Sequence, residues 1–367
     1  MLVHRPFRSL VFFKKTDSLL LRDYFVKRCK IFDDFPWDKF NPKELFNKYA
    51  LLPEPDSQKY SEELGAINDL SVSNAMPTLI KKAGELGIDY KDKTAYDLSL
   101  AFFLKSQSEF EKTHEFFYLE QMPGYSDYRG KEPKEPKTFD KIKTVCEKTL
   151  TEKFKEQNRG EMVIEHYEEK NKQAYVIYYE DHKKPKPEIK GGVIIYKKER
   201  PVYEAALIYY SSEGRLKIKA RKSKIRDLCV KTFAKEVLDD EDFFNHPDAT
   251  KVYDLDKFKG LPLKYPTDPV HEIENIKEVA IKAAFPGSDE TIELHSEDDL
   301  KGLLKKHNVN LNQMEILKIG IKIKFPGAGR RGSKTVWLSQ SNHSNISDSP
   351  VDRIIDNYLK KWDIANR

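Results

Sequence analysis

Hydrophobic residues recur at intervals of three and four through the first 158 residues, the spacing of amphipathic helices. The clearest stripe lies in residues 138–158 and consists of Phe139, Ile142, Cys146, Leu150 and Phe154. Similar patterns occur in residues 18–32, 75–87 and 106–122. The pattern therefore predicts a mainly helical N-terminal part.

After Gly160 the hydrophobic residues alternate with polar ones, which is the two-residue period of a strand. Five such segments follow one another: EMVIEHYEE, QAYVIYYED, GGVIIYKKE, VYEAALIYY and GRLKIKA. Because short polar turns join them, we expect an antiparallel meander. The next segment, KSKIRDLCVKTFAKEVL, returns to helical spacing and predicts a helix that covers the sheet.

The remaining chain mixes strands and helices, with alternating residues in MEILKIGIKIKF and an amphipathic helix that starts near Pro350. Helices come first and strands with covering helices follow, which predicts an α+β fold rather than alternating β–α–β units. We predict three parts. They are a mainly helical domain at 1–135, a helix plus antiparallel sheet domain at 136–245, and a C-terminal α+β segment at 246–367 that packs on the sheet domain.

The composition indicates a folded, polar protein. Of the 367 residues 39% are hydrophobic, 34% are charged and 12% are aromatic, and the formal net charge is +5. The three cysteines are far apart, so neither a disulfide framework nor a zinc motif is expected. Without an 18-residue apolar stretch or a signal-peptide pattern, we expect a soluble cytoplasmic protein with no membrane partner. The excess of Lys over Arg, with frequent Ile, Asn and Tyr, favours a bacterial source.

The glycine-rich stretch FPGAGRRGSKTVW resembles a phosphate-binding loop, because its glycines fit G-x-G-x-x-G. Such a loop needs a helix after it, whereas Thr335, Val336 and Trp337 favour a strand. We therefore predict a β-hairpin. Its tip carries Arg330, Arg331 and Lys334, which either contact nucleic-acid phosphates or form a solvated turn.

A row of basic residues occupies alternate positions in GRLKIKARKSK. Leu216, Ile218 and Ala220 are expected to pack inward. The opposite face would then carry Arg215, Lys217, Lys219 and Arg221, and Lys224 extends the charge into the next helix. Two interpretations stay open. The row binds a phosphate backbone, or it keeps the sheet soluble.

Carboxylates on neighbouring strands are the only weak catalytic candidates. Glu165, Glu180 and Asp181 could hold Mg²⁺ or Mn²⁺ for phosphodiester cleavage. They show no convincing D…(D/E)-x-K register, and the chain has no HExxH or G-x-S-x-G motif. We therefore assign no catalytic residue, no metal and no cofactor.

These observations favour binding over catalysis. The first hypothesis is a non-catalytic nucleic-acid-binding regulatory or accessory protein, of the kind found in bacterial defence or mobile-element loci. The first alternative is a protein-interaction subunit of a larger complex, with the helical N-terminal part as its docking surface. The second is a metal-dependent nuclease or phosphoesterase that uses the three carboxylates above.

Overall fold

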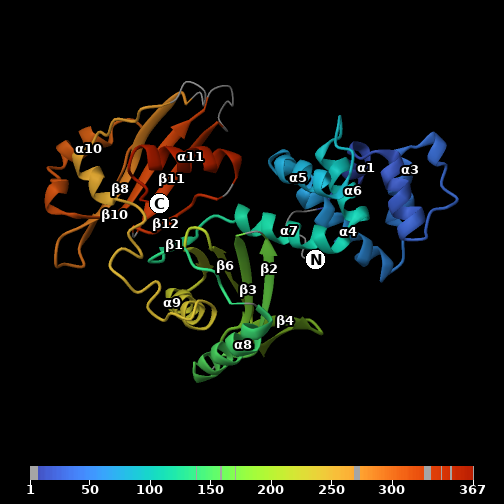
Figure 1. Ribbon diagram of the computed structural model, residues 1–367, viewed down its shortest axis with the longest axis horizontal. Helices are drawn as coiled ribbons and strands as arrows, with labels where there is room; N and C mark the ends of the chain where they lie inside the picture. The colour runs from blue at the N-terminus through green and yellow to red at the C-terminus, as the bar shows by residue number, and fades with distance from the viewer. Residues whose placement is uncertain are drawn as a thin grey trace. The chain divides into compact units, whose positions relative to one another are not determined.

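The computed structural model describes residues 7–137, 139–157, 159–169, 171–267, 273–325, 332–339, 341–347 and 349–366 (Figure 1). The chain forms two compact units, Met1–Gln121 and Met122–Arg367. The first is helical and the second is built on an antiparallel sheet with covering helices. This confirms the predicted α+β fold class.

The first unit is a set of short helices around an aromatic core. The helices are α1 (Ser9–Lys15), α2 (Ser18–Arg22), η1 (Asp23–Arg28), η2 (Trp37–Lys39), α3 (Pro42–Ala50), α4 (Asp56–Leu70), η3 (Ser73–Ala75), α5 (Met76–Leu86), α6 (Ala95–Lys105) and α7 (Gln107–Gln121). Rings such as Phe13, Phe25 and Tyr49 meet edge to face at the centre. Thr94 and Asp97 form a capping box that starts α6.

The second unit contains a ten-stranded sheet among the described residues, and every neighbouring pair in it is antiparallel. In spatial order its strands are β2 (Met162–Glu169), β3 (Lys172–Glu180), β6 (Val202–Tyr210), β7 (Arg215–Ala220), β1 (Ser126–Arg129), β12 (His343–Ser344), β11 (Ser333–Ser339), β10 (Glu315–Lys324), β8 (Asn275–Ala284) and β9 (Thr291–His295).

Two hydrophobic cores lie along this sheet. The strands β2, β3, β6 and β7 pack against α8 (Phe139–Glu156), α9 (Ser223–Thr232) and η4 (Phe233–Val237). The strands β8, β10 and β11 pack against η5 (Leu255–Gly260), α10 (Leu300–Lys306), η7 (Leu311–Gln313) and α11 (Pro350–Lys361). The short strand β1 joins the two halves, because Ser126 pairs with Ile218 on one side and His343 on the other.

The glycine-rich stretch lies between two paired strands, as predicted. Strand β10 pairs with β11 from Lys318 opposite Ser339 to Lys324 opposite Ser333. The strand that follows the glycines therefore replaces the helix that a nucleotide loop requires. Residues 326–331 themselves lie outside the described residues.

One predicted strand does not join the meander. The segment GGVIIYKKE contributes β5 (Val193–Glu199), which pairs with β4 (Lys184–Lys190) in a separate two-stranded sheet. In the main sheet β3 instead pairs directly with β6. The sequence signal for a strand was therefore correct, but its expected place in the sheet was wrong. In the part of the chain that is described, no helix combines the length and apolarity needed to cross a membrane.

Candidate nucleic-acid interface

Strand β7 carries the predicted row of cations, and its inward face is as expected, since Leu216 and Ile218 are fully buried. On the other face Arg215 and Lys217 are also buried, with only 9% and 6% of their surface exposed. Lys217 stands directly opposite Asp127 of β1, which is 1% exposed. At these exposures Arg215 and Lys217 offer little charged surface to a ligand.

The accessible charge lies where β7 ends and α9 begins. Arg221 is exposed, and its guanidinium carbon lies 4.3 Å from the centre of the Tyr203 ring on β6. Lys219 is half-buried beside it. A surface depression of about 370 Å³ is lined by these three side chains together with Gly124, Glu204, Ala206 and Ala220. Cations beside an aromatic face suit a phosphate and a stacked base.

Helix α9 extends this charge. Lys222 and Lys224 are exposed at its start, and Arg226 is half-buried one turn later. The twelve residues from Arg215 to Arg226 contain seven basic residues and no acidic one. The first turn of α9 also lacks an acidic residue, so these cations face the positive end of the helix dipole. The Asp181 carboxylate, 3.0 Å from the Lys222 ammonium nitrogen, offsets part of this repulsion, and a bound anion would offset the rest.

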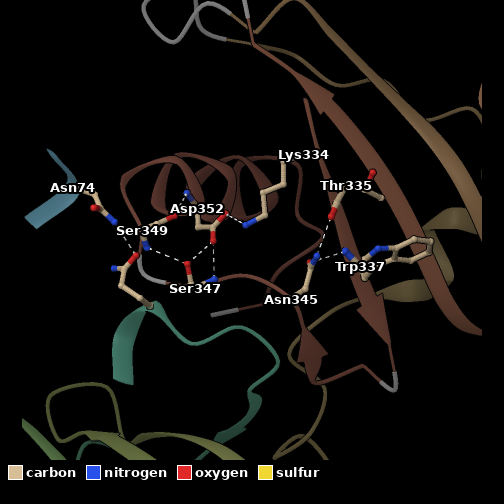
Figure 2. Close-up of polar contacts among 9 residues, drawn as sticks. Asn74, Lys334, Thr335, Trp337, Asn345, Ser347, Ser349 and Asp352 are labelled. Atoms are coloured by element: carbon tan, nitrogen blue, oxygen red, sulfur yellow. Dashed lines mark hydrogen bonds and ion pairs between the residues drawn. The ribbon is translucent and has the colours of Figure 1, made fainter. Parts of the chain in front are cut away.

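Lys334 has an internal partner. Its ammonium group pairs with the carboxylate of Asp352, which is 1% exposed near the start of α11 (Figure 2). The same carboxylate accepts hydrogen bonds from the backbone N–H of Ser347 at 2.8 Å and from its hydroxyl at 2.6 Å. Lys334 therefore ties β11 to α11. The other two predicted cations, Arg330 and Arg331, lie outside the described residues.

The structure does not gather the three candidate acids. Glu165 lies opposite Val176, four residues before Glu180 on β3, a separation of about 13 Å along a strand. Glu165 accepts a hydrogen bond from the Tyr167 hydroxyl at 2.8 Å. Among the described residues no group of three or more His, Cys, Asp or Glu side chains could hold a metal ion.

Asp181 is buried and surrounded by cations. Its carboxylate pairs with Arg159 and lies 3.0 Å from the Lys222 ammonium nitrogen. Burial by itself would raise the pKa of Asp181, but the hydrogen bond from Lys222 and the nearby Arg159 charge hold it below its usual range. Asp181 is therefore an ionised, ion-paired anchor between β3 and α9.

A polar cluster at the seam between the two half-sheets was not foreseen from the sequence. The Ser126 hydroxyl lies 3.4 Å from His343 Nδ1 and accepts a hydrogen bond from Arg226 at 3.2 Å. Burial, followed by the Arg226 charge, lowers the pKa of His343. The three residues are more than 80 positions apart in sequence, so no local motif could reveal them.

Tyr203 was also missed as a partner of the cations. No aromatic residue interleaves with the cations of β7 itself, because the ring comes from the neighbouring strand β6. Only the pairing of β6 with β7 could reveal this contact. Comparison with known proteins gives no further lead, since no family model and no curated protein matches the sequence.

Proposed function

We propose that this protein binds nucleic acid as a non-catalytic regulatory or accessory factor. The observation that carries the proposal is the basic surface around Arg221, which lies with Lys219 beside the Tyr203 ring and continues to the exposed Lys224 on α9. These cations lie along the chain from the end of β7 to the start of α9. They can therefore contact consecutive phosphates of one backbone. A role in a bacterial defence or mobile-element setting belongs to the same proposal.

The chemistry of this surface favours contacts to the backbone over reading of sequence. Arg221 lies against an aromatic ring, which fixes the guanidinium plane while leaving its N–H donors able to reach a phosphate. Phosphate contacts carry no sequence information by themselves. We therefore expect an affinity that depends steeply on salt and little on base sequence.

Charge reversal tests the proposal. Labelled duplex DNA, single-stranded DNA and RNA would be titrated with the full chain at several salt concentrations. The double variant Arg221→Glu/Lys224→Glu should lose at least tenfold in affinity, since it replaces two attractive contacts with repulsive ones. Lys305→Glu/Lys306→Glu in the last turn of α10 makes the same change of charge on two exposed side chains of a helix that packs on the other half-sheet.

Equal loss in both variants would indicate a general charge effect and not a site. Unchanged affinity in the double variant would remove this surface from the binding site. If the wild-type protein binds no nucleic acid even at low salt, the proposal fails. The alternative of a protein-interaction subunit would then take its place.

A further inference from the structure

The strands β4 and β5 form an arm that projects from the second unit, away from α8 and the strands β2 and β3 (Figure 1). Lys190 pairs with Val193 across a two-residue turn, Gly191–Gly192. Both glycines have positive φ, at 60° and 79°, as a tight hairpin turn with native twist requires. The arm is therefore a well-formed two-stranded ribbon.

The end of the arm exposes large apolar side chains. Ile189 and Ile194 face each other across the ribbon and are 82% and 60% exposed, and Tyr196, on the same face, is 71% exposed. A cluster of this kind costs free energy in water, and soluble proteins rarely keep one without a ligand. The cluster indicates that something covers the arm in the functional state.

The arm and the two residues that flank it hold the formal net charge of the protein. The arm itself, residues 184–199, contains five Lys against two Glu, a formal charge of +3. With Lys183 and Arg200 the formal charge of residues 183–200 is +5, which equals the charge of the whole chain. The rest of the chain has equal numbers of basic and acidic residues and is neutral. An apolar end on a strongly basic ribbon fits a partner that is anionic along its edges and apolar between them.

The arm has two free edges, and the edge formed by β4 is poorly suited to strand addition. In a two-residue hairpin the closing pair Lys190–Val193 exchanges hydrogen bonds, so Pro185 and Pro187 occupy positions whose N–H would point outward. Proline has no N–H, and these two residues remove two donors from that edge. A second copy of the chain would therefore find a poor edge on β4, whereas the edge of β5 keeps its N–H donors.

The base of the arm adjoins the interface described above. The Asp181 N–H donates to the Pro201 carbonyl at 2.9 Å, and Arg200 donates to the Asp181 carbonyl at 3.2 Å, which closes the base. On the arm, the Lys184 ammonium lies 5.8 Å from the Tyr203 ring that Arg221 contacts. The positive surface is thus continuous from the arm to α9.

We propose that the arm enters the major groove of duplex DNA, with Ile189, Ile194 and Tyr196 against the base edges and the lysines, most of them on the opposite face of the ribbon, reaching the phosphates at the rims of the groove. A two-stranded ribbon fits the major groove, which is about 12 Å wide, and is too broad for a minor groove of about 6 Å. Seven residues per strand span about 23 Å, enough to cross that groove. Apolar side chains there contact thymine methyl groups. This inference rests on the proposed function and names the class of ligand.

The first test titrates duplex DNA and single-stranded DNA with two variants of the full chain. Ile189→Ser/Ile194→Ser should bind a labelled 30-base-pair duplex at least tenfold more weakly than wild type and bind single-stranded DNA within about twofold, because a single strand has no groove. Val163→Ser, which removes an exposed apolar side chain from β2 and leaves the arm intact, should bind both like wild type. Unchanged duplex affinity in the arm variant overturns the inference.

The second test uses the unaltered protein, so folding of a variant does not enter. Acetylation of surface lysines, read by mass spectrometry, should slow at least fivefold at Lys184, Lys190 and Lys198 when duplex DNA is bound. Lys306 should react at an unchanged rate. Distamycin, which fills the minor groove, should leave binding intact. Unprotected arm lysines in a bound complex, or displacement by distamycin, overturns the inference.

The outcomes separate the two proposals. A wild-type protein that binds no nucleic acid removes both. A wild-type protein that binds duplex and single strand equally, with no effect of the arm variant, removes only the arm. Sedimentation measures whether a second copy of the chain covers the apolar end. A wild-type dimer that becomes a monomer in the arm variant would show that it does, and would also overturn the inference.

Discussion

The carboxylate of Asp181 lies 3.0 Å from the ammonium nitrogen of Lys222, and the same carboxylate pairs with Arg159. Asp181 follows the last residue of β3, and Lys222 precedes the first residue of α9. One buried acid thus fastens together the base of the arm and the start of the basic helix. The two parts of the proposed interface therefore share one anchor.

Asp181→Asn should destabilise the second unit by about 3 kcal/mol, because it leaves the nearly buried Arg159 without its counter-charge. Urea denaturation followed by circular dichroism measures this. Asp227→Asn, at an exposed carboxylate on α9, serves as the control and should change stability little. A neutral effect of the Asp181 substitution would show that the pair contributes no net stability.

The same substitution should alter the response to acid. The folded-state pKa of Asp181 is lowered, so its contribution is present above the unfolded value of 3.8 and is lost as the pH falls through the lower folded value. The free energy of unfolding of the wild-type protein should therefore fall as the pH drops below about 4. Asp181→Asn should make that fall less steep. Equal slopes below pH 4 in both proteins would contradict the assignment.

Lys224 and Lys334 should behave differently although both were predicted to bind phosphate. Lys224→Ala should reduce the slope of log affinity against log salt by about 1 for duplex DNA, as loss of one phosphate contact does. Lys334→Ala should leave that slope unchanged and lower the melting temperature, because Lys334 pairs with the buried Asp352. Binding titrations at four salt concentrations and a thermal melt distinguish the two roles.

His114 should make the helical unit sensitive to alkaline conditions. It is fully buried, with Nε2 at 3.3 Å from Asp69 and Nδ1 at 3.4 Å from Glu115. Burial lowers the pKa of His114, but its hydrogen bonds to the carboxylates of Asp69 and Glu115 outweigh burial and raise the pKa above 6.5. A raised folded-state pKa contributes stability that is complete below pH 6.5 and is lost as the pH rises through the folded value.

Asp69→Asn should therefore reduce the fall in the free energy of unfolding above pH 6.5. The fluorescence of Trp37, in a Trp337→Phe/Trp362→Phe background, reports on the helical unit alone. Urea titrations at a series of pH values give the slope. A slope that is the same with and without the Asp69 carboxylate would argue against a charged His114.

Gly320 should resist substitution for a local reason. It lies opposite Trp337 in the β10–β11 pair, and a Cβ there would come within 2.7 Å of the indole ring. Lys318 covers the same ring at 4.3 Å. Gly320→Ala should therefore cost about 1–2 kcal/mol of stability by overpacking. Gly84→Ala on α5, where a Cβ would meet open space, should be stabilising by up to about 1 kcal/mol. A stabilising Gly320→Ala would mean that the indole moves freely.

Periodicity along the chain was sufficient for the fold class and for most elements. The stripe at 138–158 became α8, the alternation around Leu216 became β7, and Thr335 to Trp337 formed a strand after the glycines. These features depend on local spacing, which the backbone period converts directly into a buried face. Part of the candidate site was visible in the same way, since Lys219, Arg221 and Lys224 were singled out from their alternation and charge.

The sequence by itself determined that the chain forms helices first and an antiparallel sheet afterwards, and that its cations cluster near residues 215–226. Only the tertiary structure decided which cations are accessible, because burial of Lys217 and the pairing of Lys334 with Asp352 depend on strands that are distant in sequence. It also decided that residues 184–199 leave the meander as an arm. A strand pattern specifies a pleated segment, whereas its partner is chosen by packing against the rest of the fold.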